Sequence, residues 1–207
     1  MVPGESDLFS RFGQELQAGT VIFKEGAEGD QMFIVQTGRV KVSRSIAGKE
    51  QLLAVLGKGD FFGEMALVTR EPRTATVTAL EAVRLLAFNR EGFLGMINKN
   101  PKIALNIIDK LCRRLANANQ HLRHLARKDA RGLIAMNLRL AFQASGGAGL
   151  DLERTVEEFA RNLELDPGQV RGVLEEFGGT GIVRLTSGSM DLADESRLNL
   201  ISEPLGV

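Results

Sequence analysis

The chain of 207 residues contains one cysteine, two histidines, and no tryptophan or tyrosine. The single cysteine, Cys112, excludes an internal disulfide framework and a zinc or iron–sulfur site built on several thiolates. Two histidines leave little material for a transition-metal site. No apolar run approaches the roughly 20 residues that span a bilayer, and the first residues lack a basic segment followed by an apolar one. We therefore expect a cytoplasmic protein without a metal site or a membrane partner.

The formal net charge is zero, but the charges are unevenly distributed along the chain. Residues 1–100 carry 12 basic and 12 acidic side chains, residues 101–150 carry 9 and 2, and residues 151–207 carry 5 and 12. The three segments therefore have net charges of 0, +7 and −7. Such an asymmetry bears on the partners of a protein and not on its fold.

Residues 19 to 88 have the pattern of short strands separated by turns. Runs such as QMFIVQTG, RVKVSRS and VRLLAF alternate with glycine turn positions. Many short strands with turn residues between them are typical of an antiparallel sandwich or roll. A helical pattern then starts at Arg90 and is interrupted at Asn100–Pro101.

A heptad pattern follows Pro101, which itself suits the first position of a new helix. Apolar residues step by four and three along a helix that we expect to run to about Arg127. At 1.5 Å per residue, this predicts a parallel dimer helix of about 40 Å. The alternative is a helix packed on its own domain. The predicted dimer seam consists of Ala104, Ile108, Leu111, Leu115, Ala118, Leu122 and Leu125.

The C-terminal third is typical of a helix-turn-helix with a wing. A helix is expected at about 130–144, and two short helices then cross at a tight turn near Glu164–Leu165. Asp166 suits an N-cap and Pro167 the first position of the second of these helices. Two apolar runs, at 182–185 and 190–192, flank a Ser-Gly-Ser turn and predict a hairpin.

The densest motif is FFGEMALVTREPRTATV, at residues 61–77. A glycine, a short turn of backbone N–H groups and a nearby arginine make a cradle for an anion. Arg73 adds charge-assisted and often bidentate hydrogen bonds to a phosphate. Glu64, nine residues earlier, can accept hydrogen bonds from sugar hydroxyls. One phosphate and one ribose within this reach indicate a nucleoside monophosphate.

The segment from Gly63 to Leu67, followed by the run from Pro72 to Thr76, resembles the phosphate-binding cassette of cyclic nucleotide-binding domains. With the preceding strand pair and the heptad helix and winged helix-turn-helix that follow, residues 15–200 resemble the CRP/FNR family of bacterial regulators. The resemblance implies an α+β fold: an N-terminal β-roll (an antiparallel double-stranded jelly roll), a long dimerisation helix and a C-terminal winged helix. We place these domains at residues 1–100, 101–128 and 129–207.

The resemblance also implies a binding site for a cyclic nucleotide. Glu64 would bind the ribose 2′-hydroxyl, and Arg73 with Thr74 would hold the cyclic phosphate. The backbone N–H groups of Met65 and Ala66 would complete the anion site, and two residues beside the dimer seam would reach the nucleotide. The alternative is that Glu64 and Arg73 merely pair in a decayed pocket. The implied site comprises Gly63, Glu64, Met65, Ala66, Arg73, Thr74, Arg114 and Asn119.

Three residues bear on which base this site selects. Ala118 cannot hydrogen-bond a base edge, whereas the amide of Asn119 offers both a donor and an acceptor. Thr74 lies where cGMP-selective kinase domains also have a threonine. We favour cAMP, with cGMP as the alternative. His121 and His124 are expected to be solvated or phosphate-facing, and Cys112 to be a small packed side chain.

The helix that would read DNA departs from the family pattern. Family members usually place a base-reading Arg-Glu pair where this chain has Pro167 and Gly168, and the next reading position is Gly172. Only Gln169 and Arg171 can make directional base contacts. The net charge of −7 opposes binding to phosphates. The +7 segment can compensate, dock the acidic module of a subunit, or simply be a solvated surface.

No catalytic set is visible, so we expect a sensor and not an enzyme. The first hypothesis is a cAMP-responsive homodimeric regulator that binds duplex DNA and contacts the transcription machinery. The second is a nucleotide sensor whose degenerate, acidic helix-turn-helix contacts a protein partner in place of DNA. A third is a DNA binder that no longer needs the nucleotide.

Overall fold

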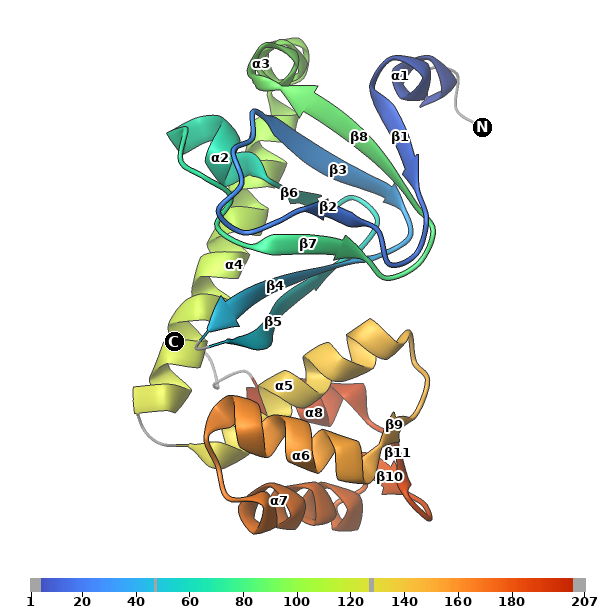
Figure 1. Cartoon of the computed structure of the whole chain (residues 1–207), viewed down its shortest axis with the longest axis vertical. Helices are drawn as coiled ribbons and strands as arrows, with labels where there is room; N and C mark the ends of the chain where they lie inside the picture. Colours follow the sequence, from blue (N-terminus) through green and yellow to red (C-terminus); the bar gives the residue numbers. More distant parts are fainter. Residues whose placement is uncertain (1–4, 47, 127–128, 203–207) are drawn as a thin grey trace. The chain divides into compact units, whose positions relative to one another are not determined.

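The structure, a computed structural model, describes residues 5–46, 48–126 and 129–202. It divides into two compact units at Ile107 and Ile108, inside the long helix α4 (Lys102–Ala126). Each unit has its own strands and its own buried core (Figure 1). The two are called the N-terminal unit and the C-terminal unit below.

The N-terminal unit is built on two four-stranded sheets in which every paired strand is antiparallel. One sheet has the order β1-β8-β3-β6 and the other the order β2-β7-β4-β5 (Figure 1). The strands are β1 (Gly13–Leu16), β2 (Val21–Phe23), β3 (Gln31–Thr37), β4 (Val40–Ile46), β5 (Lys49–Leu56), β6 (Phe61–Phe62), β7 (Thr76–Ala79) and β8 (Val83–Asn89).

Two apolar clusters fill this unit because side chains alternate between the faces of a strand. Phe33 and Phe62 stack with ring centroids 5.2 Å apart in the cluster between the two sheets. Their strand neighbours, Met32 and Phe61, enter a second cluster with Phe88. That second cluster also receives side chains from helices α1 (Glu5–Phe12), α3 (Arg90–Lys99) and the start of α4. The sheets therefore form a rigid double layer with helices on one outer face.

A short helix interrupts the strands directly after β6. This helix, α2 (Glu64–Thr69), starts after Gly63, whose φ is 79°. It ends at Arg70, which has the left-handed φ of 62°. Glycine adopts this conformation without steric cost, which explains why Gly63 stands at the turn from strand to helix.

The C-terminal unit consists of helices with a small three-stranded sheet of order β10-β11-β9 at one side of them (Figure 1). Its core contains Ile134, Leu138, Leu174, Phe177 and Met190, all fully buried. Besides α4, its elements are α5 (Ala130–Ser145), β9 (Leu150–Asp151), α6 (Leu152–Leu163), α7 (Pro167–Gly179), β10 (Val183–Leu185), β11 (Ser189–Leu192) and α8 (Glu195–Ser202).

The α+β fold expected from the sequence is confirmed, including the start of α3 at Arg90 and the hairpin of β10 and β11. Asp166 caps α7 as expected, since its Oδ1 accepts hydrogen bonds from the backbone N–H groups of Gly168 and Gln169 at 2.8 and 3.2 Å. The expected end of the long helix at Arg127 lies outside the described residues. Helices α1, α2 and α8 were not expected.

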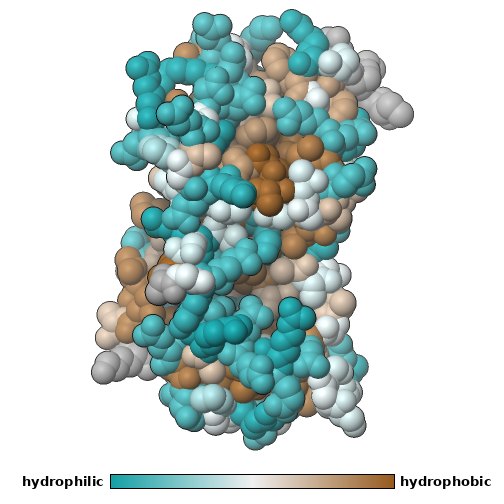
Figure 2. Space-filling model, in the orientation of Figure 1, coloured by the Kyte–Doolittle hydropathy of each residue, from teal (hydrophilic) through white to brown (hydrophobic). Residues whose placement is uncertain are grey.

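Large apolar side chains are exposed on both units, and apolar residues are visible in brown among hydrophilic ones in Figure 2. Among the described residues, α4 carries the longest series: Leu105, Ile108, Leu111, Leu115, Leu122 and Leu125. Leu115 and Leu122 are each 62% exposed in the single chain. This helix therefore presents an apolar stripe that the chain itself leaves uncovered.

Candidate functional site

Arg73 is the only charged side chain that is buried among the residues that the structure describes, with 6% of its surface exposed. Its Nη1 donates a hydrogen bond to the carbonyl oxygen of Gly63 at 2.9 Å, and its guanidinium carbon lies 4.1 Å from the ring centroid of Phe23. Its Nε is buried without a hydrogen-bond partner. Burial lowers the pKa of Arg73, whereas the carboxylates of Asp30 and Glu64 act in the opposite direction.

A buried cation with an unsatisfied N–H is costly unless an anion completes its hydrogen bonds. Arginine remains charged at any ordinary pH, so it cannot avoid this cost by losing its proton. The arrangement around Arg73 is therefore chemically suited to binding an anion such as a phosphate.

Two glycines make room for the Arg73 side chain. A Cβ atom built on Gly29 would lie 2.3 Å from Nε of Arg73, and one built on Gly63 would lie 2.6 Å from Nη1. The backbone of Arg73 is also fixed, because its N–H donates to the carbonyl oxygen of Ala27 at 2.8 Å and its own carbonyl accepts from Gly26 at 2.8 Å. The loop between β2 and β3 therefore holds the backbone of Arg73, and Gly29 in that loop leaves space for the guanidinium.

Helix α2 places the other expected residues of the cassette beside this arginine. Glu64 is half-buried, Ala66 is buried and Met65 is exposed. The hydroxyl of Thr74 donates to Sδ of Met65 at 3.6 Å. The first N–H groups of a helix have no partner inside the helix, so those at the start of α2 suit an anion as well. The N-terminal unit thus brings together six of the expected residues: Gly63, Glu64, Met65, Ala66, Arg73 and Thr74.

The two remaining expected residues, Arg114 and Asn119, lie on α4 in the part of that helix that belongs to the C-terminal unit. Arg114 is half-buried and Asn119 is exposed. The expected seam residues lie on the same helix, and Ile108, Leu115 and Leu122 are exposed there by 55%, 62% and 62%.

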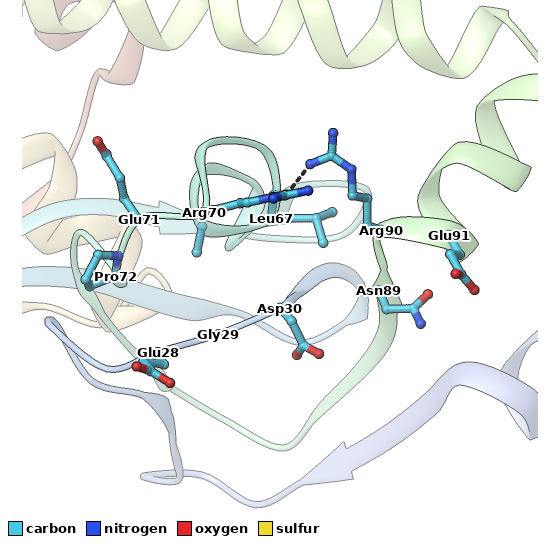
Figure 3. Close-up of a pocket in the computed structure, with 11 residues that line it drawn as sticks. Glu28, Gly29, Asp30, Leu67, Arg70, Glu71, Pro72, Asn89, Arg90 and Glu91 are labelled. Carbon is cyan, nitrogen blue, oxygen red and sulfur yellow. Dashed lines mark hydrogen bonds between the residues drawn. The ribbon is translucent and has the colours of Figure 1, made fainter.

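A cavity of about 860 Å³ opens in the N-terminal unit between the β2–β3 loop, the end of α2 and the start of α3 (Figure 3). Arg90 donates from Nη1 to the carbonyl oxygen of Leu67 at 3.2 Å at its edge (Figure 3). Four carboxylates and two guanidinium groups line the cavity. Of the expected binding residues, only Ala66 lines it. Sequence reasoning missed this cavity because three segments distant in sequence form it.

The helix-turn-helix carries both residues expected to contact DNA. Gln169 is exposed near the start of α7. Arg171 donates from Nη2 to Oε2 of Glu153 on α6. A second ion pair joins Nε of Arg131 on α5 to Oε1 of Glu176 on α7 at 3.0 Å.

His124 is not solvated, and the expectation that it would be solvated or face a phosphate is wrong. Its side chain is 12% exposed, and its Nδ1 lies 2.7 Å from Oδ2 of Asp129. Gln120, one helical turn earlier, is buried and donates from Nε2 to the carbonyl oxygen of Ser202. Cys112 was expected to be packed, but it is exposed in the single chain.

No cluster of three or more histidine, cysteine, aspartate or glutamate side chains that could hold a metal ion occurs among the described residues. None of the described helices is both long enough and apolar enough to cross a membrane.

The sequence profile of the cyclic nucleotide-binding domain matches residues 13–100, which contain the whole β-roll and the surroundings of Arg73. This class of domain is therefore present in the N-terminal unit.

Relatives of similar length extend the comparison to the rest of the chain. A CRP-like cAMP-activated global transcriptional regulator of Mycobacterium tuberculosis is 31% identical over 186 residues, covering 87% of this chain and 83% of the relative. The cyclic AMP receptor protein of Thermus thermophilus is 32% identical over 205 residues, covering 98% of this chain and 94% of the relative. The crystal structure of the Thermus thermophilus catabolite activator protein matches with a TM-score of 0.54 at 32% identity. The match covers 98% of this chain and 95% of that structure's chain. The chain belongs to the CRP/FNR family of regulators.

Proposed function

We propose that the protein is a cyclic nucleotide-responsive transcription regulator that binds duplex DNA as a homodimer. The observation that carries this proposal is the buried guanidinium of Arg73, whose Nε lacks a partner beside a glycine-lined turn. The nucleotide's cyclic phosphate would satisfy that Nε, and Thr74 and the N–H groups of Met65 and Ala66 would complete the phosphate site. Glu64 would accept a hydrogen bond from the ribose 2′-hydroxyl.

We favour cAMP as the ligand, with cGMP as the alternative. The relatives from Mycobacterium tuberculosis and Thermus thermophilus are both named for cAMP, which supports this choice. In the proposed complex, Arg114 and Asn119 of α4 would approach the nucleotide. The Asn119 amide would read the base edge, because Ala118 offers no hydrogen bond.

The exposed apolar stripe of α4 supports the homodimer. A seam with this spacing and with leucines that are 62% exposed in one chain gains free energy when a second copy covers it. We keep the division into a β-roll at residues 1–100, a dimerisation helix at 101–128 and a winged helix at 129–207. We also propose that this cytoplasmic protein is a sensor and not an enzyme, since no catalytic set is visible in its sequence.

Nucleotide binding would act on DNA binding through the seam. A ligand shifts a two-state equilibrium only by its difference in affinity for the two states. Because α4 would contact both the nucleotide and the partner subunit, the bound nucleotide would favour one arrangement of the two helices. That arrangement would place the two winged helices at the spacing of their half-sites.

One observation favours a second function, in which the winged helix contacts a protein in place of DNA. The segment from residue 151 onward has 5 basic and 12 acidic side chains, and duplex affinity comes largely from neutralised phosphates. Such a module would suit a basic surface on another protein.

Fluorescence anisotropy of a labelled mixed-sequence duplex tests the proposal. The titration is made at roughly 50 mM salt, where even weak phosphate contacts are favoured, with and without saturating cAMP. We expect duplex binding that appears or tightens with cAMP. An absence of duplex binding in both conditions, with cAMP binding confirmed by calorimetry, would contradict the DNA function and favour a protein partner.

A further inference from the structure

Helix α7 has very few basic side chains with which to bind a DNA duplex. Between Pro167 and Gly179 the only basic residue is Arg171. On the exposed side of the helix, a Cβ built on Gly172 would meet nothing within 4 Å, so this position presents bare backbone. Arg171 is therefore the one cationic side chain with which α7 can contact a phosphate or a guanine.

The structure shows Arg171 already occupied by a carboxylate. Its Nη2 donates to Oε2 of Glu153, which lies in the first turn of α6. The two side chains are 36% and 66% exposed, so the pair lies where solvent reaches it. Glu175, one turn further along α7, is a second carboxylate close enough to act on Arg171. A further ion pair joins α7 to another helix, with the carboxylate of Glu176 on α7 holding Arg131 of α5.

We propose that Glu153 is an acidic gate on DNA binding, whose carboxylate occupies the Arg171 guanidinium until a DNA phosphate or base edge displaces it. The proposal rests on the DNA-binding function proposed above. An exposed ion pair is worth little in water, so exchange for a phosphate is feasible. The exchange nevertheless leaves the Glu153 carboxylate near the DNA backbone, and this repulsion lowers the affinity of the free arginine.

The substitution Glu153→Gln tests the gate, because it removes the charge and keeps the shape of an exposed side chain. We expect duplex affinity to rise roughly 3- to 10-fold at a fixed cAMP concentration. The logarithm of the affinity should also fall more steeply with the logarithm of the salt concentration. The expected gain in slope is at most about 0.9, because the variant removes one negative charge close to the DNA phosphates.

Glu158→Gln is the matched control. Glu158 is exposed on the same helix, and its substitution changes the net charge equally. No ion pair found among residues 5–46, 48–126 and 129–202 involves it. We expect this variant to change duplex affinity less than twofold. The double variant Glu153→Gln/Arg171→Gln should bind no better than Arg171→Gln, because the gain requires the released arginine.

Equal gains from Glu153→Gln and Glu158→Gln would overturn the gate and leave a general charge effect. A gain that persists without Arg171 would overturn it as well, while leaving the DNA function intact. If neither the wild type nor any variant binds duplex at roughly 50 mM salt, although each binds cAMP by calorimetry, the DNA function itself is contradicted and the gate falls with it.

Discussion

The carbonyl oxygen of Gly63 accepts a hydrogen bond of 2.9 Å from Nη1 of Arg73. This bond joins the turn before α2 to the loop before β7, so the two parts of the phosphate-binding motif hold one another in place. Nη1 of Arg73 is used in this bond, and Nε is buried without a hydrogen-bond partner. The guanidinium is therefore held in place with one N–H still available to a ligand. Preorganisation of this kind reduces the entropy that ligand binding must overcome.

Replacement of Arg73 by glutamine should weaken cAMP binding by roughly 10- to 150-fold. This range corresponds to the loss of a charge-assisted hydrogen bond, which is worth about 1.5–3 kcal/mol. Isothermal titration calorimetry measures the effect, and the thermal unfolding midpoint reports whether the variant folds. The control is Arg44→Gln, which removes an exposed guanidinium paired with Glu25. A folded Arg73→Gln variant with unchanged affinity would remove Arg73 from the site.

Replacement of Gly29 by alanine should weaken cAMP binding by displacing Arg73, although Gly29 itself has no side chain that could contact the ligand. The new Cβ would lie 2.3 Å from Nε of Arg73, so the guanidinium must move away from its position. We expect at least a 10-fold weaker affinity, since a charge-assisted bond of about 1.5 kcal/mol is lost or distorted. Gly57→Ala is the matched control, because its Cβ would meet only Cγ of Arg39, at 3.9 Å. Equal affinities of the two variants would argue against this role of Gly29.

Replacement of Leu115 by glutamate should dissociate the dimer. Leu115 is 62% exposed in one chain, and a parallel pair of α4 helices would bury two copies of it. Burial of one leucine is worth about 1.5–3 kcal/mol, so we expect the dimer dissociation constant to rise roughly 100-fold or more. Sedimentation equilibrium over a range of concentrations gives this constant. Asn117→Glu adds the same charge away from the seam and should leave the dimer intact. A dimer that tolerates Leu115→Glu would place the interface elsewhere.

The ionised carboxylate of Asp129 should stabilise the folded C-terminal unit at neutral pH, and this stabilisation should be lost in strong acid. Burial raises the pKa of Asp129, but hydrogen bonds from Gly132 and His124 outweigh it, and the net shift is downward. A lowered folded-state pKa gives stability that is present above the unfolded value of about 3.9 and lost as pH falls through the folded value. We expect Asp129→Asn, which keeps an N-cap for α5, to lower the free energy of unfolding by about 0.5–1 kcal/mol at pH 7.

Urea unfolding of the wild type and Asp129→Asn at several pH values measures this difference. We expect the difference to be present at pH 7 and to shrink below about pH 4. A difference that does not depend on pH would show that the aspartate acts through its shape and not through its charge.

The sequence predicted those parts of the molecule that depend on local pattern. The glycine-punctuated strands, the helix α4 and the cap of α7 at Asp166 all arise from neighbours in the chain, and they are found where they were expected. The cassette was recognisable because its residues lie within 12 positions of one another, from Gly63 to Thr74.

Contacts between distant residues were not predictable from pattern. The heptad register placed His124 away from the seam of the long helix, where a solvated or phosphate-facing side chain was expected. However, Oδ2 of Asp129, five positions further along the chain, lies 2.7 Å from Nδ1 of the imidazole. Gln120 meets Ser202, which lies 82 positions away, and Glu153 holds Arg171, 18 positions away. In each case the tertiary packing brings the two residues together, and the spacing of residues along the sequence does not show which distant residues will meet.

In the proposed function, cyclic nucleotide and duplex DNA bind to the same protein with coupled free energies. Linkage requires each ligand to change the affinity of the other by the same factor. The most direct test is calorimetric measurement of the cAMP dissociation constant with and without a saturating duplex, at fixed salt. We predict that the duplex tightens cAMP binding by the factor by which cAMP tightens duplex binding. A cAMP affinity that the bound duplex leaves unchanged would contradict this coupling.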